Sequence, residues 1–194
     1  MRSPFLTGIV IAAGLSFAAP AIAAPCTASD PMEIYSGGNP CNKRPGYSKV
    51  ARTTVSFTGN YKPGSIVINT TERRLYYVLE GGEAIRYGIG VGRAGYTWAG
   101  TKTVTEKKEW PDWTPPAQML ARRPDLPRHM KGGEDNPLGA RAMYLGSTLY
   151  RIHGSNEPDT IGEAVSSGCF RMTNDDVKHL YEKVQVGTTV YILR

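Results

Sequence analysis

Only one segment of this chain has the apolar spacing of an α-helix, and that restriction limits the fold more than any other feature. Within residues 174–187, four apolar side chains fall at positions i, i+3, i+4 and i+7, namely Val177, Leu180, Tyr181 and Val184. Asn174 is expected to cap the start of this helix, and Gly187 is expected to end it. The core must therefore come mainly from strands, and the sequence predicts a mainly β fold with little helix.

Strands are expected where β-branched and aromatic residues cluster between turn residues. The segments that fit are 53–57, 65–69, 75–79, 84–91, 101–107, 142–152 and 188–193. Glycines at the end of the 84–91 segment predict bulges or close backbone approach. Residues 109–127 hold five prolines and two tryptophans, so they predict a structured loop without helix.

The net charge of +6 and the isoelectric point of about 9.3 suit contact with an anionic polymer. Cell wall, membrane surface and nucleic acid all qualify. The basic residues are scattered and form no long Lys/Arg run, which argues against nucleic acid as the partner.

The first 23 residues have the pattern of a cleaved secretory signal. Arg2 supplies the positive start, residues 5–19 are uncharged and mostly apolar, and residues 20–23 end in an A-x-A pattern, so cleavage is expected after Ala23. The apolar run is short for a membrane span. An uncleaved anchor is one alternative, and a lipoprotein modified at Cys26 is disfavoured by the preceding Pro25. The expected location is the periplasm or cell envelope.

Three cysteines follow the expected cleavage point. Cys26 and Cys41 are close in sequence, and in an oxidising compartment a disulfide between them would staple the N-terminal extension, residues 24–62. Cys169 is then left unpaired, and a lone thiol in an exported protein suggests a reactive role. The alternative is a buried, inert cysteine.

Around Cys169 the sequence places groups that could make it a nucleophile. A thiol needs a base near it, and His153 at the end of an expected strand can serve. We predict that Cys169 lies in a turn just ahead of a helix N-terminus, which favours a thiolate. The backbone N–H groups of Ser167, Gly168 and Cys169 are candidates for stabilising an oxyanion.

Other polar residues leave alternatives open. Arg171 suits either a substrate carboxylate or a structural ion pair, with neither favoured. No acidic residue stands out to orient His153, so a backbone carbonyl is the expected partner. Trp110 and Trp113 would line a cleft or pack within the Pro-rich loop. Gly90–Gly95 fits G-x-G-x-x-G but precedes a strand, which argues against a dinucleotide site, and no metal-binding pattern such as H-E-x-x-H occurs.

Taken together, these motifs resemble the L,D-transpeptidase family with the YkuD-type catalytic domain. That family carries His-Gly, a gap, and then Ser-(His or Ser)-Gly-Cys-x-Arg, matched here by His153-Gly154 and residues 166–171. The likeness extends over residues 63–194 and includes Pro63-Gly64-Ser65, Val91-Gly92-Arg93, Trp110-Pro111-Asp112-Trp113, Asn136-Pro137-Leu138-Gly139 and Gly187-Thr188-Thr189-Val190. One departure is Ser167, where many members have His.

The resemblance implies a sandwich- or barrel-like β domain with one or two short helices. It implies cleavage of peptidoglycan stem peptides before the terminal D-alanine, with Cys169 as nucleophile, His153 as general base and acid, and the Gly154 carbonyl orienting His153. A second stem then accepts the acyl group in a 3→3 cross-link, or an envelope protein or D-amino acid does. No metal or organic cofactor is implied, and a monomer is expected.

Three other functions remain as alternatives. An L,D-carboxypeptidase or related hydrolase would share the acyl-enzyme, because the acceptor pocket decides whether an amine or water attacks. A catalytically silent wall-binding module would be expected to lack Cys169 or His153, and the chain has both. An exported redox protein would be expected to show C-x-x-C, which is absent from this sequence.

Overall fold

The computed structural model describes residues 50–194. The expected signal peptide, Cys26 and Cys41, and residues 24–49 of the expected extension lie outside the described residues. In the described part of the chain, no helix is both long and apolar enough to cross a membrane.

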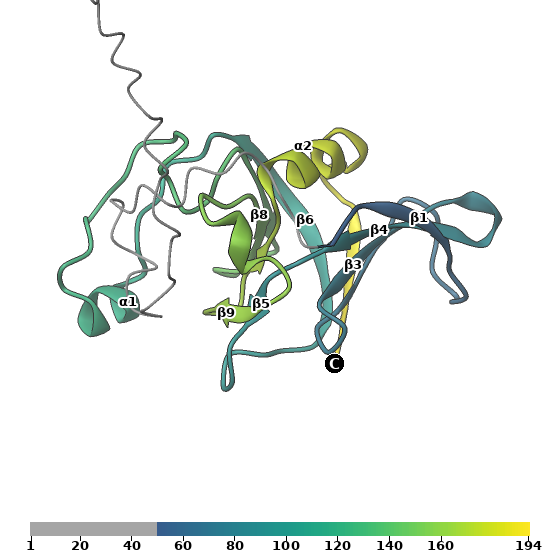
Figure 1. The fold of residues 1–194 in the computed structure, drawn as a ribbon, viewed down its shortest axis with the longest axis horizontal. Coiled ribbons are helices and arrows are strands. Elements are labelled where there is room, and N and C mark those ends of the chain that lie inside the picture. Colours follow the sequence, from purple (N-terminus) through teal and green to yellow (C-terminus); the bar gives the residue numbers. More distant parts are fainter. Residues whose placement is uncertain (1–49) are drawn as a thin grey trace, which may run out of the picture.

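Most of the strands belong to one sheet of nine, in the order β1-β4-β3-β2-β11-β6-β7-β8-β10. Their bounds are β1 Thr53–Ser56, β2 Ile66–Asn69, β3 Arg74–Val78, β4 Glu83–Gly88, β6 Gly100–Glu109, β7 Arg141–Leu145, β8 Arg151–His153, β10 Phe170–Arg171 and β11 Thr189–Leu193. Neighbouring strands are antiparallel except for β2 with β11 and β8 with β10. Figure 1 shows β1, β3 and β4 at the opposite end of the molecule from helix α1.

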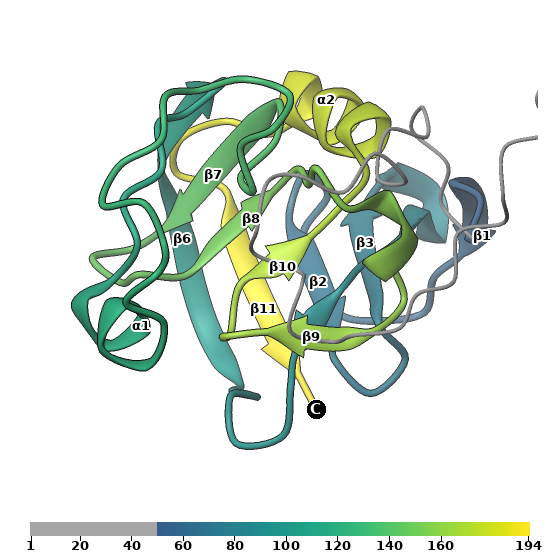
Figure 2. The ribbon, with the colours of Figure 1, turned by 60° about the vertical axis from the view of Figure 1, so that its left-hand side comes forward.

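Strand β6 joins the two halves of this sheet. Its first residues, Gly100–Thr103, pair with β11, and the part from Val104 to Glu109 pairs with β7. A register shift lies between Val104 and Glu106, where a bulge bends a strand and increases its twist. The sheet therefore curves around the core, as Figure 2 shows.

Two short contacts close the curved sheet on itself. Strand β5 (Val91–Gly92) pairs with β9 (Ala164–Ser166). Next to it, Gly90 and Arg171 exchange two backbone hydrogen bonds of 2.9 Å, which tie the end strand β10 to the chain that leaves β4. A Cβ at Gly92 would lie 2.4 Å from the Tyr96 carbonyl oxygen, so the expected close backbone approach is confirmed. The fold is mainly β and barrel-like, as predicted.

Helix α2 (Asn174–Lys183) is the predicted helix, and it buries Val177 and Leu180 in the main core. Its cap differs from the prediction. Thr173 is the N-cap, and its hydroxyl accepts from the Asp176 N–H at 3.2 Å. Asn174 is the first helical residue, and its side-chain oxygen accepts a hydrogen bond from the Ala140 N–H instead of capping the helix. The helix also stops at Lys183, while Gly187 adopts a positive φ of 98° in the turn that follows.

The Pro-rich loop contains a helix that the sequence analysis did not predict. Helix α1 (Ala117–Arg122) follows Pro115 and Pro116, and proline before the first turn does not interrupt a helix because the first N–H groups have no helical partner. The next proline is at position 124, beyond the end of α1. Trp113, Leu126 and Leu138 form a small second core here. In Figure 2, α1 and the loop around it lie beside β6 and β7. Two short 3₁₀ helices, Glu80–Gly82 and Pro158–Thr160, are the remaining elements among residues 50–194.

Candidate active site

A cavity of about 320 Å³ lies between the sheet and the Pro-rich loop. The wall formed by the sheet and its turns is lined by Leu149, Tyr150, Arg151, His153, Cys169 and Arg171. The opposite wall belongs to α1 and the surrounding loop, taken from here on as residues 110–140. It is lined by Trp113, Pro116, Met119, Arg122 and Leu138. The structure therefore brings the predicted residues Cys169, His153 and Arg171 together at one cavity.

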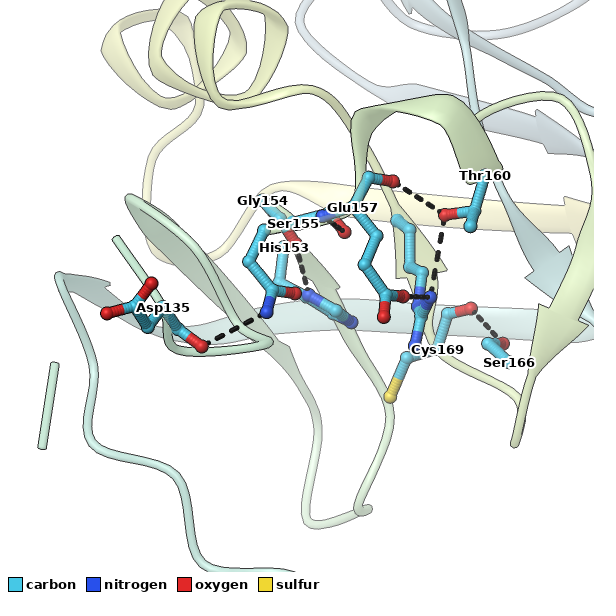
Figure 3. A network of polar contacts seen from close by, with 10 residues as sticks. Asp135, His153, Gly154, Ser155, Glu157, Thr160, Ser166 and Cys169 are labelled. Carbon is cyan, nitrogen blue, oxygen red and sulfur yellow. Dashed lines mark hydrogen bonds and ion pairs between the residues drawn. The ribbon is translucent and has the colours of Figure 1, made fainter. Parts of the chain in front are cut away.

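His153 ends strand β8, and its imidazole is held by the backbone that follows it. The His153 Nδ1 lies 2.6 Å from the Gly154 carbonyl oxygen (Figure 3). A carbonyl only accepts hydrogen bonds, so Nδ1 carries the proton and Nε2 keeps its lone pair. The expected backbone partner of His153 is thus present, and the ring has the tautomer that a general base needs.

Gly154 holds this carbonyl in a space too small for a side chain. A Cβ at Gly154 would lie 2.3 Å from Asn174 Oδ1 and 3.0 Å from the Ala140 nitrogen. Asn174 Oδ1 also accepts a hydrogen bond of 2.9 Å from the Ala140 N–H. The first residue of α2 therefore fixes the chain around His153, a role that local sequence patterns do not reveal.

Cys169 follows a tight turn that begins at Ser166. The Ser166 hydroxyl donates to the Cys169 carbonyl at 2.6 Å and accepts from the Gly168 N–H at 3.1 Å. Gly168 has a φ of 108°, and a Cβ there would lie 2.5 Å from the Tyr150 ring. Only glycine suits this position, because both the φ and the contact exclude a side chain.

The Gly168 N–H, one of the expected oxyanion donors, is bonded to the Ser166 hydroxyl at 3.1 Å in this structure. The expectation that Cys169 lies just ahead of a helix N-terminus is wrong. Strand β10 separates Cys169 from α2, which starts five residues later, so the thiol does not sit at the helix N-terminus. Pairing of Phe170 with Ile152 made this stretch a strand, a long-range contact that local patterns do not predict.

The register between β8 and β10 sets the distance between the candidate base and nucleophile. Arg171 pairs with His153 in this parallel pair of strands, so Cys169 lies two residues before that pair on the neighbouring strand. Strand spacing and rise put the two Cα atoms about 8 Å apart, a gap that the two side chains can bridge. The Cys169 thiol itself donates to the Leu149 carbonyl at 3.6 Å.

Burial disfavours the charged form of both groups. The pKa of His153 is lowered to about 3, first by burial and then by the positive charge of Arg171. Burial also raises the pKa of the Cys169 thiol, although the nearby charges of Arg151 and Arg171 oppose that shift. Both shifts favour a thiol beside a neutral imidazole over a stored thiolate and imidazolium.

Arg171 forms the ion pair that was one of its two expected roles. Its guanidinium donates to Glu157 at 2.8 Å, and both side chains are 6% exposed. Burial raises the pKa of the Glu157 carboxyl more than the charge of Arg171 lowers it. Glu157 was not singled out in the sequence, because nothing local marks it as the partner of a residue 14 positions away.

Aromatic residues that the sequence analysis passed over support the Cys169 turn. Trp98 donates from its indole Nε1 to the Gly168 carbonyl at 2.9 Å and stacks on Tyr150, with ring centroids 4.4 Å apart. Trp113 both packs in the loop core and lines the cavity, so its two expected roles coincide. Trp110 is 36% exposed and does not line the cavity.

The Gly90–Gly95 motif does not lead into a helix. Gly90–Gly95 runs through strand β5 and continues towards β6 without a helix, so the dinucleotide fingerprint has no phosphate-binding helix start. Among residues 50–194 no group of three or more His, Cys, Asp and Glu side chains is placed to hold a metal ion.

Comparison with known proteins identifies the family. The YkuD family, described as the L,D-transpeptidase catalytic domain, matches residues 63–192. "Probable L,D-transpeptidase YbiS" of Escherichia coli strain K12 is 44% identical over 137 residues, which are 66% of this chain and 44% of that protein. The alignment thus spans less than half the length of such curated relatives.

Two solved structures are similar in fold. L,D-transpeptidase 3 from Mycobacterium tuberculosis superposes with a TM-score of 0.54 at 18% identity, over 67% of this chain and 60% of that one. A Brucella melitensis protein described as "Probable carnitine operon oxidoreductase caia" is 47% identical, with a TM-score of 0.52 over 73% of this chain and 92% of that one. The oxidoreductase description applies to that protein, and the Gly90–Gly95 geometry offers no dinucleotide site here.

Proposed function

The chain belongs to the YkuD family of L,D-transpeptidase catalytic domains, and on that premise we propose that it is a peptidoglycan L,D-transpeptidase acting through Cys169. One observation carries this proposal. Cys169 and His153 line the same cavity, and the Gly154 carbonyl leaves His153 Nε2 free to accept a proton. The proposed substrates are peptidoglycan stem peptides, and the proposed product is a 3→3 cross-link.

In the first half-reaction, Cys169 Sγ attacks the carbonyl carbon before the terminal D-alanine. The thiol proton passes to His153 Nε2 as the S–C bond forms, because the low pKa of His153 disfavours a stored imidazolium. The N–H groups of Ser167 and Cys169, which have no acceptor among residues 50–194, are the proposed donors to the oxyanion. His153 then returns the proton to the departing D-alanine nitrogen, and a thioester remains.

The second half-reaction reverses these steps with a new amine. A side-chain amine of a second stem attacks the thioester, His153 takes its proton, and the thiol of Cys169 is released. An envelope protein or a D-amino acid is an alternative acceptor, and water would make the same site a carboxypeptidase. The charge of Arg171 is neutralised by its ion pair with Glu157. We therefore assign Arg171 a structural role in the cavity wall and not a role in binding substrate.

Location and partners follow from the same proposal. The signal-like residues 1–23 support export to the cell envelope, where stem peptides are found, and the net charge of +6 suits an anionic wall polymer. We propose that the enzyme works there as a monomer without a nucleic-acid partner.

The test is an assay of the purified protein with a disaccharide-tetrapeptide, followed by mass spectrometry. Loss of D-alanine with a cross-linked dimer is expected, and Cys169→Ala should lower that rate by at least about 10³-fold. Unchanged thermal melting of Cys169→Ala controls for folding. Tripeptide without dimer would reassign the protein as a carboxypeptidase. If neither product forms, the transpeptidase proposal is overturned.

A further inference from the structure

The cavity is positively charged and has no acidic residue in its lining. Three arginines line it, namely Arg122, Arg151 and Arg171, and among residues 50–194 no Asp or Glu does. Most of the remaining lining is apolar or aromatic, which strengthens electrostatic attraction inside the cavity. Such a site suits a ligand that brings its own negative charge.

The three arginines differ in what they already bind. Arg171 is committed to Glu157. Arg122 is exposed on α1, with its guanidinium 5.8 Å from the Tyr96 ring centre. The Arg151 guanidinium lies 5.0 Å from the Tyr144 ring centre and donates to the Leu149 carbonyl at 3.0 Å. Among residues 50–194 it forms no ion pair with a carboxylate, and its buried Nε has no acceptor. On the wall that carries Cys169, Arg151 is therefore the arginine whose charge is not neutralised and whose guanidinium has N–H groups left to donate.

Arg151 also lies directly beside the proposed nucleophile. Since Phe170 pairs with Ile152, the next position back along both strands sets Cys169 against Arg151. The Leu149 carbonyl accepts from both of them, at 3.6 Å from Cys169 Sγ and at 3.0 Å from Arg151. A shared acceptor of this kind holds the guanidinium and the thiol at the same end of the cavity.

We propose that Arg151 binds the free carboxylate of the residue that leaves the donor peptide. This inference rests on the proposed function. When Cys169 attacks the scissile carbonyl, the carboxylate of the departing D-alanine lies three bonds from the carbon under attack, so a cation beside the thiol can reach it. The forked guanidinium can pair with both carboxylate oxygens, which positions the scissile bond and excludes donors that lack a carboxylate there.

The test compares two donor peptides that differ only at the C-terminus, a tetrapeptide acid and its C-terminal amide. The wild-type protein should prefer the acid in kcat/KM by about 10- to 100-fold, mainly through KM. Arg151→Gln should reduce this ratio to near 1, and Arg151→Lys should retain part of it. Loss of the Arg151 charge also affects the Cys169 thiol, but that effect is equal for both peptides and cancels in the ratio.

Arg128→Gln is the matched control, because it removes an exposed arginine that does not line the cavity and should keep the ratio. Binding of the acid peptide to Cys169→Ala, measured by calorimetry, needs no reaction, so it should weaken by about 10-fold or more when Arg151→Gln is added. If that binding changes but no product ever forms, the carboxylate site stands and the transpeptidase proposal fails. An unchanged acid-to-amide ratio, or unchanged peptide binding, in a folded Arg151→Gln protein would overturn the inference.

Discussion

The two walls of the cavity are built in different ways. The wall that carries Cys169 and His153 consists of sheet strands and turns, held by backbone hydrogen bonds such as Met172 N–H to His153 O at 2.8 Å and backed by the main core. The wall across from it is a loop with the short helix α1 and a core of only three buried residues. The contrast suggests that the sheet supplies fixed chemistry while the loop supplies an adaptable surface for substrate.

The largest difference between the walls should appear when an ion pair is broken in each. Glu157→Gln leaves Arg171 buried without its counter-charge, so it should lower the free energy of unfolding by about 3–5 kcal/mol. Asp125→Asn breaks the Arg123–Asp125 pair in the loop, where Asp125 is exposed to solvent, and should leave the free energy of unfolding nearly unchanged. Urea unfolding measures the free energy of unfolding of both variants. Equal losses of stability would show that the ion pairs of the two walls do not differ in strength.

Adding one methyl group to each wall should have the next largest effect. In Gly154→Ala the added methyl group clashes with Asn174 Oδ1 and the Ala140 nitrogen. The substitution should therefore displace the backbone carbonyl of residue 154 that orients His153, and lower kcat by about 10²-fold. Gly133→Ala in the loop meets nothing within 4 Å and should leave kcat unchanged. Steady-state assays of the two variants test this, and full activity of Gly154→Ala would show that the carbonyl position is not critical.

Thiols on the two walls should differ in the pH dependence of their reactivity. The pKa of Cys169 is raised by burial, so its alkylation by iodoacetamide should rise about tenfold per pH unit between pH 6 and 8 and keep rising above pH 9. A cysteine placed on the loop, G133C in a Cys169→Ala background, should level off near an ordinary pKa of about 8.5. Mass spectrometry of the labelled peptides separates these sites from Cys26 and Cys41. A plateau for Cys169 between pH 6 and 8 would indicate a preformed thiolate instead.

The smallest effect is expected from weakening the loop core. Leu180→Ala in the main core should cost about 2–5 kcal/mol of global stability. Leu126→Ala should cost less than about 1 kcal/mol globally, because the loop can open while the sheet stays folded. Hydrogen exchange should nevertheless rise for residues 110–140 in this variant. A global loss as large as that of Leu180→Ala would show that the two walls unfold together.

Much of the fold could be predicted because its signals are local. The apolar spacing of Val177, Leu180 and Val184 predicts α2, and the β-branched runs predict the strands, since burial on one face requires the matching period. The Cys169 motif and the His153-Gly154 pair could likewise be identified from spacing. Helix α1 differs from the expected helix-free loop, because Pro115 and Pro116 precede its first turn and do not interrupt it.

Local sequence patterns are therefore enough to predict the fold class, the family, and the thiol and imidazole at the centre of the site. How the residues around these two groups are used follows from the three-dimensional fold. Arg171 is committed to Glu157, Asn174 supports Gly154 instead of capping α2, and the Gly168 N–H is taken by Ser166. Each of these depends on which strand lies beside which and in what register. Such pairings are long-range, and burial then shifts the pKa of Cys169 and His153 in ways that residue type alone does not specify.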